Sequence, residues 1–250
     1  MADVFIGVSL KLYFDHDTTR RWCRSVATAV SGHPALTRRE AELVVLPSYP
    51  SLPAAVETFA GTGVEVGAQD LSWVERGPYT GEVSAETLRQ VGCSHVVIGH
   101  AERRRYFEEE QGRLGAKVAA AARAGLVPLV CIGEARRTEA GRAADECLGQ
   151  LDGIPLPPRA VVAYEPEWAI GAVAAAPPGY VRDVVTRVRA GLEAAARTVR
   201  VIYGGAAGPG TLDALGDAVD GVFLGRSAHD PAAVVRLLDE VAARPSGRTV

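Results

Sequence analysis

Apolar and polar positions divide the chain into short apolar runs separated by longer segments with helical spacing. Eight runs are each long enough for one strand, and several are apolar throughout. A strand that is covered on both faces needs such continuous apolarity, because neither face meets water. The runs are Phe5–Val8, Leu43–Leu46, Val64–Ala68, Val96–Ile98, Val127–Cys131, Val161–Tyr164, Val199–Tyr203 and Val222–Leu224.

Signals for helix starts lie in the segments between these runs. Asp230 followed by a proline predicts an N-cap with proline at the first helical position. Asp17 or Thr18 is expected to cap an early helix. Thr37-Arg-Arg-Glu40 fits a capping box for a short turn, and Arg136 to Leu151 has helical spacing throughout.

Eight strand–helix units in 250 residues predict an α/β protein, a single (β/α)8 barrel, with a doubly wound sheet as the alternative. No shift in composition marks a linker, so one domain is expected over residues 1–250, with 244–250 as a frayed tail. In such a barrel, catalytic groups lie where strands end and loops begin.

Composition narrows the class of partner. With 48% hydrophobic and 23% charged residues the chain is globular, and its net charge of −3 argues against a nucleic-acid partner. No apolar run approaches the roughly 20 residues that span a bilayer, and the N-terminus does not resemble a secretory signal. We therefore expect no membrane partner and a cytoplasmic location. Four cysteines without a CxxC pair or a suitably spaced histidine predict buried thiols and no metal site: Cys23, Cys93, Cys131 and Cys147.

The first candidate for chemistry is Glu165, which follows the run Val161–Tyr164 directly and precedes Pro166. Burial disfavours the charge of a carboxylate, yet it suits a general base, whose pKa should lie near the working pH. A solvated or ion-paired loop acid is the alternative. Other runs are followed in the same way by Lys11, His100, Gly204-Gly205 and Gly225-Arg226. His95, at the opposite end of its run, is expected to be structural.

Five motifs occur in one order, each after an expected strand or in a following loop. They are Tyr79-Thr-Gly-Glu82, Gly99-His-Ala-Glu-Arg-Arg104, Cys131-Ile-Gly-Glu134, Ala163-Tyr-Glu-Pro-Glu-Trp-Ala-Ile-Gly171 and Tyr203-Gly-Gly205. Through them the chain resembles the triosephosphate isomerase family over nearly its whole length. The resemblance implies the TIM-barrel fold and the isomerisation of a short phosphorylated sugar, without cofactor or metal.

The resemblance also implies roles for individual residues. Glu165 matches the family's base, His100 its electrophile and Lys11 the cation beside the developing oxyanion. Glu102 would pair with Lys11 or order the site, although a simple helix-start acid is the alternative. Ser9 and Ala206 match positions that contact substrate or phosphate. Residues that supply or surround the phosphate-binding N–H groups would be Gly171, Gly204, Gly205 and Gly225, with Arg226 beside them.

Two further segments carry implications from the family. Trp168 to Ala176 resembles a lid that closes over the substrate, although its second half, Gly171-Ala-Val-Ala-Ala-Ala176, departs from the family's pattern. The loop Tyr79–Glu82 resembles one that reaches into a neighbouring subunit, which implies a homodimer.

Several departures fall at the substrate end. Ser9 replaces the family's Asn, Ala101 and Ala206 replace Ser, and Arg226 replaces Gly. Phe223-Leu-Gly-Arg-Ser227 is similar to a motif of a sister group, the tetrulose-phosphate isomerases. The intact base, electrophile and lysine favour a triose phosphate, interconverting glyceraldehyde 3-phosphate and dihydroxyacetone phosphate. A tetrulose phosphate such as L-erythrulose 1-phosphate is the alternative, and a catalytically inactive phosphosugar-binding protein is a third.

Overall fold

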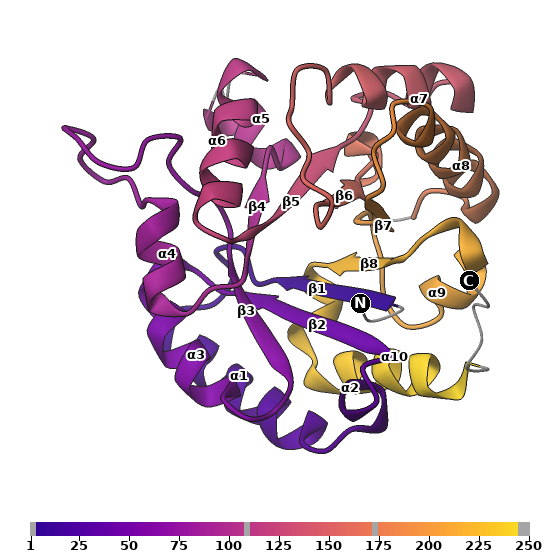
Figure 1. The fold of residues 1–250 in the computed structure, drawn as a ribbon. Helices are drawn as coiled ribbons and strands as arrows, with labels where there is room; N and C mark the ends of the chain where they lie inside the picture. The colour runs from indigo at the N-terminus through magenta and orange to yellow at the C-terminus, as the bar shows by residue number, and fades with distance from the viewer. Residues whose placement is uncertain (1–3, 108–110, 172–174, 245–250) are drawn as a thin grey trace.

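The computed structural model describes residues 4–107, 111–171 and 175–244. Eight parallel strands pair in chain order, and β1 closes the barrel by pairing with β8 (Figure 1). The strands are β1 (Val4–Ser9), β2 (Ala41–Leu46), β3 (Val64–Ala68), β4 (His95–Ile98), β5 (Val127–Ile132), β6 (Val161–Tyr164), β7 (Arg200–Tyr203) and β8 (Gly221–Leu224). The predicted (β/α)8 barrel is confirmed.

Helices follow the strands and pack around the barrel (Figure 1). They are α1 (His16–Val30), α2 (Pro34–Thr37), α3 (Leu52–Phe59), α4 (Ala85–Val91), α5 (Ala101–Phe107), α6 (Gln111–Arg123), α7 (Ala140–Gly149), α8 (Pro178–Ala194), α9 (Thr211–Leu215) and α10 (Pro231–Ala243). Short 3-10 turns are η1 (Tyr49–Ser51), η2 (Glu167–Ala169), η3 (Gly216–Ala218) and η4 (Arg226–His229).

Alternation along the strands divides the core into two layers, because successive side chains point to opposite faces. One buried cluster fills the barrel interior, and a larger one lies between the strands and the helices. The interior cluster consists of Phe5, Val44, Leu46, Val97, Val127, Leu129, Cys131, Val161, Ala163, Ile202 and Phe223. Gly7 belongs to the same layer: a Cβ there would lie 2.5 Å from the ring of Phe223, so the ring fills the space that glycine leaves.

Charged side chains occupy the amino-terminal end of the barrel, below this interior cluster. The ring nitrogens of His95 lie 3.1 Å from Glu42 Oε1 and 3.4 Å from Glu65 Oε2. Arg200 donates to Glu42 at 2.6 Å. Ligand atoms of Glu42, Glu65 and His95 lie within 4.8 Å of one another, but the carboxylates approach different ring nitrogens. This arrangement suits an imidazolium that bridges two carboxylates.

Three local predictions about helices are wrong. The N-cap of α1 is Asp15, whose side chain accepts from Thr18 N at 2.7 Å, rather than Asp17 or Thr18. Thr37 ends α2 instead of capping a turn, because Pro34 with its fixed φ already starts that helix. α7 begins at Ala140 and not at Arg136, because residues 135–139 form a loop. The Asp230 cap of α10 is confirmed.

Two predicted segments extend beyond the described residues. Residues 172–174 of the lid-like segment and 245–250 of the predicted tail lie outside the described residues. The four cysteines are buried free thiols, as predicted. Within the described part of the chain, no helix combines the length and apolarity that crossing a membrane requires.

Candidate active site

A cavity of about 590 Å³ opens at the carboxyl-terminal end of the barrel. Its lining brings together every residue that the sequence singled out for the site. These are Ser9, Lys11, His100, Glu102, Glu165, Gly171, Gly204, Gly205, Ala206, Gly225 and Arg226. They come from loops after five of the strands, β1, β4, β6, β7 and β8, and they meet because parallel strands end at the same rim.

Strand alternation aims Glu165 into this cavity. Val161 and Ala163 belong to the interior cluster, so Glu165 continues the same inward face one step beyond β6. Its backbone N–H donates to Ile132 O at 2.7 Å, which prolongs the pairing of β6 with β5. Gly204 leaves the space that the side chain needs, because a Cβ there would lie 2.5 Å from Glu165 Cγ and Oε1.

Glu165 is a carboxylate in an almost dry position. It is 2% exposed, and its Oε2 has no hydrogen-bond partner among the described residues. Burial raises the pKa of Glu165 above its usual value, although nearby His100 and the positive charges of Lys11 and Arg104 lower it. A carboxylate whose proton affinity is raised and whose oxygen is unengaged is suited to accept a proton.

His100 faces Glu165 across the cavity floor, with its Nε2 3.5 Å from Glu165 Oε2. Its Nδ1 accepts the backbone N–H of Glu102 at 3.1 Å at the start of α5. A nitrogen that accepts a hydrogen bond carries no proton, so the geometry assigns a neutral ring with its hydrogen on Nε2. His100 therefore presents an N–H donor to the cavity.

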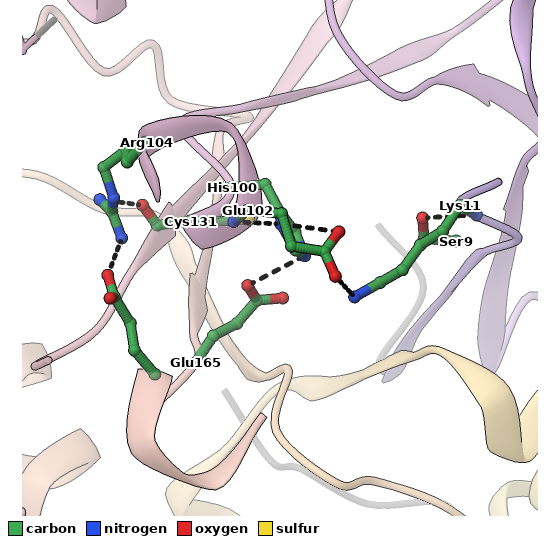
Figure 2. A network of polar contacts seen from close by, with 8 residues as sticks. Ser9, Lys11, His100, Glu102, Arg104, Cys131 and Glu165 are labelled. Carbon is green, nitrogen blue, oxygen red and sulfur yellow. Dashed lines mark hydrogen bonds and ion pairs between the residues drawn. The ribbon is translucent and has the colours of Figure 1, made fainter. Parts of the chain in front are cut away.

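Lys11 supplies a positive charge beside these two groups (Figure 2). Its Nζ donates to Glu102 Oε1 at 2.8 Å, and Glu102 lies in the first turn of α5, close to His100. The backbone of Lys11 has φ +47°, a strained conformation for a residue with a side chain. Gln69 at the end of β3 holds it, because its Nε2 donates to Lys11 O at 3.1 Å and to Leu46 O at 2.9 Å.

Loops after β7 and β8 form the wall opposite the helix of His100. Within the described residues, the backbone N–H groups of Gly205 and Gly225 donate to no other backbone group, whereas the N–H of Ala206 faces the hydroxyl of Tyr203. The N–H of Gly204 is different, because it donates to Tyr164 O at 2.8 Å. Free backbone donors together with exposed Arg226 offer the cavity a positive wall that suits an anion.

Glu134, which belongs to the Cys131–Glu134 motif, is buried beneath the lid-like segment and accepts hydrogen bonds from three side chains. Its Oε1 accepts from Tyr164 Oη at 3.1 Å, from Trp168 Nε1 at 2.7 Å and from Tyr180 Oη at 2.8 Å. Arg137 lies over the rings of Trp168 and Tyr180 at 5.6 and 5.7 Å. These contacts fix the first part of the segment, whose Gly171 has φ +72° and so needs glycine.

Sequence reasoning missed part of the rim. The cavity lining also includes Tyr13, Arg105, Tyr106, Glu167 and Ile170. Glu167 and Ile170 lie inside the motif that carries Glu165, so that motif could have indicated them. The others come from loop and helix positions whose side-chain directions depend on packing that no local pattern reveals.

Comparisons with known proteins agree with this geometry. A family model described as Triosephosphate isomerase matches residues 4–241. L-erythrulose-1-phosphate isomerase of Pectobacterium atrosepticum is 47% identical over 244 residues, covering 94% of each chain. Triosephosphate isomerase of Citrifermentans bemidjiense is 40% identical over 241 residues, 90% of this chain and 93% of the relative. That of Synechococcus sp. (strain JA-3-3Ab) is 32% identical over 253 residues, 98% of each chain.

The match spans the whole barrel and every strand end that lines the cavity. The resemblance that the motifs indicated is therefore confirmed, as is the prediction of an isomerase of this kind. The chain belongs to the triosephosphate isomerase family, a family of sugar-phosphate isomerases.

Proposed function

We propose that this protein moves the carbonyl of a short sugar phosphate to the neighbouring carbon by proton transfer through an enediolate, which gives an aldose from a triose ketose and a second ketose from a tetrulose 1-phosphate. The observation that carries the proposal is the convergence of Glu165, His100 and Lys11 on one cavity at the end of the barrel. The reaction needs a base for a carbon-bound proton and stabilisation of an oxyanion, and these three side chains offer both.

Each group has a defined task. Glu165 takes the proton from the carbon next to the carbonyl, the electron pair of that C–H bond forms a C=C bond, and the π pair of the carbonyl moves onto its oxygen. His100 Nε2–H and the charge of Lys11 stabilise the resulting enediolate. Protonated Glu165 then returns the proton to the neighbouring carbon, while a hydroxyl proton moves between the two oxygens. No net gain or loss of atoms or electrons occurs, so the scheme needs no cofactor.

The phosphate has its own support. The N–H groups of Gly205 and Gly225, which have no backbone partner among the described residues, line the wall on which a dianion would rest, and Ala206 lies between them and the cavity. Arg226 stands beside them, and a guanidinium matches the geometry of phosphate oxygens. Gly171 belongs to the segment Trp168–Ala176 that would cover the bound phosphate.

We favour a tetrulose phosphate, L-erythrulose 1-phosphate, as the substrate, which reverses the order suggested by the motifs. Identity of 47% to an isomerase named for that sugar, against 40% and 32% to two triosephosphate isomerases, supports it. Ser9 points the same way, because it is shorter than the asparagine of the family and leaves room for a fourth carbon. Triose phosphate remains the second candidate, supported by the shared set of Glu165, His100 and Lys11.

Turnover on both sugars tests the proposal. We expect kcat/KM on L-erythrulose 1-phosphate to exceed that on glyceraldehyde 3-phosphate, and Glu165→Gln to abolish both without unfolding the protein. A higher kcat/KM on the triose would make triose phosphate the substrate. Tight binding of either sugar without turnover would instead favour the inactive phosphosugar-binding protein.

We also propose that two copies of this chain form a homodimer through the loop Tyr79–Glu82. Large apolar side chains that a monomer would leave in water support it: Leu12, Tyr13, Tyr79, Tyr106 and Phe107. Light scattering should give twice the chain mass of 26.3 kDa, and Tyr79→Asp should halve it. A wild-type protein that stays monomeric at micromolar concentration would contradict the dimer. A cytoplasmic location, with neither nucleic acid nor membrane as partner, stays part of this proposal.

A further inference from the structure

Arg104 lies on α5, one helical turn after His100, and its guanidinium reaches away from Lys11 (Figure 2). It donates to Cys131 O at 3.3 Å and to Glu167 Oε1 at 3.1 Å. Cys131 lies near the end of β5, whereas Glu167 follows the base Glu165 by two positions. One side chain therefore joins the helix of His100 to the segment that carries Glu165.

Both the side chain and the backbone of Glu167 are hydrogen-bonded. Its N–H donates to Glu134 O at 3.0 Å, and it is the first residue of η2, which leads into the lid-like segment. The side chains of Arg104 and Glu167 are 18% and 27% exposed, so water screens their ion pair only in part. The ion pair thus fixes the backbone at Glu167, two positions after the base Glu165.

A second contact links Arg104, through Gln150 and Gly133, to the backbone of the base Glu165. Its Nη1 donates to Gln150 Oε1 at 3.1 Å. Gln150 in turn binds both backbone groups of Gly133, accepting from N at 2.9 Å and donating to O at 2.8 Å. Gly133 packs directly against the carbonyl of Glu165, since a Cβ there would lie 1.9 Å from Glu165 O. Arg104 thereby supports the backbone around Glu165 in two ways, through Glu167 and through Gln150 with Gly133.

We propose that the Arg104–Glu167 ion pair is a positioning contact that sets the spacing between His100 and Glu165. This inference rests on the proposed function and adds two residues to it. Neither residue needs to touch the reacting atoms: Arg104 fixes the helix of the electrophile to the segment of the base. A small displacement of a reacting group can lower turnover strongly, since proton transfer depends on near-contact geometry.

Glu167→Gln tests the contact, because it keeps the shape of the side chain and removes its charge. We expect kcat to fall about tenfold with little change in KM. Arg104→Gln should cause at least as large a fall, because it also removes the bonds to Cys131 O and Gln150. The double variant should be no worse than Arg104→Gln alone, because Arg104→Gln already removes the contact with Glu167. Arg189→Gln is the matched control: it breaks the ion pair with Asp220 outside the cavity and should leave kcat unchanged.

Ligand binding separates this inference from the proposed function. 2-Phosphoglycolate resembles the enediolate phosphate, whereas inorganic phosphate probes only the anion wall. Calorimetry should show weaker binding of 2-phosphoglycolate to Glu167→Gln, by about the factor lost in kcat, and unchanged binding of phosphate. If wild-type protein turns over neither sugar, the proposed function fails, and these two affinities still test the positioning. Equal affinities in variant and wild type, or a parallel loss for both ligands, would overturn it.

Discussion

The side chain of Glu165 fills the space that a side chain on Gly204 would need, since a Cβ on Gly204 would lie 2.5 Å from the Oε1 of Glu165. The loop after β7 therefore shapes the position of a carboxylate that comes from β6. Since the N–H of Gly204 donates to Tyr164 O at 2.8 Å, its backbone has little freedom to give way.

Gly204→Ala should consequently displace the base. We expect kcat to fall by about 100-fold or more, because the methyl group must push the carboxylate from its place. Steady-state kinetics with a melting curve will measure it. Gly141→Ala is the control, since open space surrounds that position in α7, and it should change neither kcat nor KM. Wild-type kcat in Gly204→Ala would mean that Glu165 works from another position.

Arg226→Gln should weaken binding of the substrate phosphate. We expect KM to rise about tenfold while kcat changes little, since a charge-assisted hydrogen bond to a phosphate acts in ground state and transition state alike. Competitive inhibition by inorganic phosphate should weaken by the same factor. Arg187→Gln, an exposed arginine on α8, is the matched control. Unchanged inhibition would show that Arg226 faces solvent during the reaction.

The acid limb of the pH–rate profile should report Glu165. Burial raises the pKa of this carboxyl above 4.5, so the base becomes protonated and inactive at a higher pH than an ordinary glutamate would. We expect kcat/KM to decline as pH falls through that raised pKa. A profile that stays flat down to pH 4.5 would contradict this environment for Glu165.

Stability should depend on the charged end of the barrel. Burial lowers the pKa of His95, but hydrogen bonds to Glu42 and Glu65 and their charges outweigh it and raise the pKa above 6.5. Arg200 binds Glu42, and Arg39 and Arg159 line the same hollow as the two carboxylates. The stabilisation from His95 is therefore complete below about pH 6.5 and is lost as pH rises through the raised pKa.

Denaturant unfolding between pH 6 and pH 9 measures this loss. We expect the free energy of unfolding to decline over that range, and His95→Gln to remove the decline. Glu42 behaves oppositely: burial raises its pKa, but hydrogen bonds from His95 and Arg200 lower it to about 2. Its contribution persists above pH 4.5 and disappears as pH falls towards 2. A His95→Gln variant with the same slope as wild type between pH 6 and pH 9 would rule out His95 as the titrating group.

The fold and most of the cavity lining could be predicted because their causes are local. Eight apolar runs specify eight strands, and period-two alternation from Val161 through Ala163 aims Glu165 inward. Helix starts were harder, because several capping residues stand close together: Asp15, Asp17 and Thr18 all precede the same apolar stripe. Only the side-chain hydrogen bond to Thr18 N decides among them.

Contacts between distant segments could not be predicted in the same way. Nothing in the sequence around Arg104 specifies that its side chain meets Glu167, 63 positions further on. The same holds for Gln150 and Gly133, whose bond depends on where α7 ends relative to β5. Such pairs follow from the closed barrel, which brings neighbouring loops together after the local elements have formed.

The apolar cluster inside the barrel separates the charged end with His95 from the cavity with Glu165. These apolar side chains offer no polar route for a proton that Glu165 has taken from substrate carbon. Such a proton can therefore exchange with solvent only at the mouth of the cavity. Deuterium taken up by product from heavy water should therefore report how readily the proton held by Glu165 exchanges with solvent during one turnover. Isotope incorporation would then measure the access of solvent to the protonated base, separately from the overall rate of turnover.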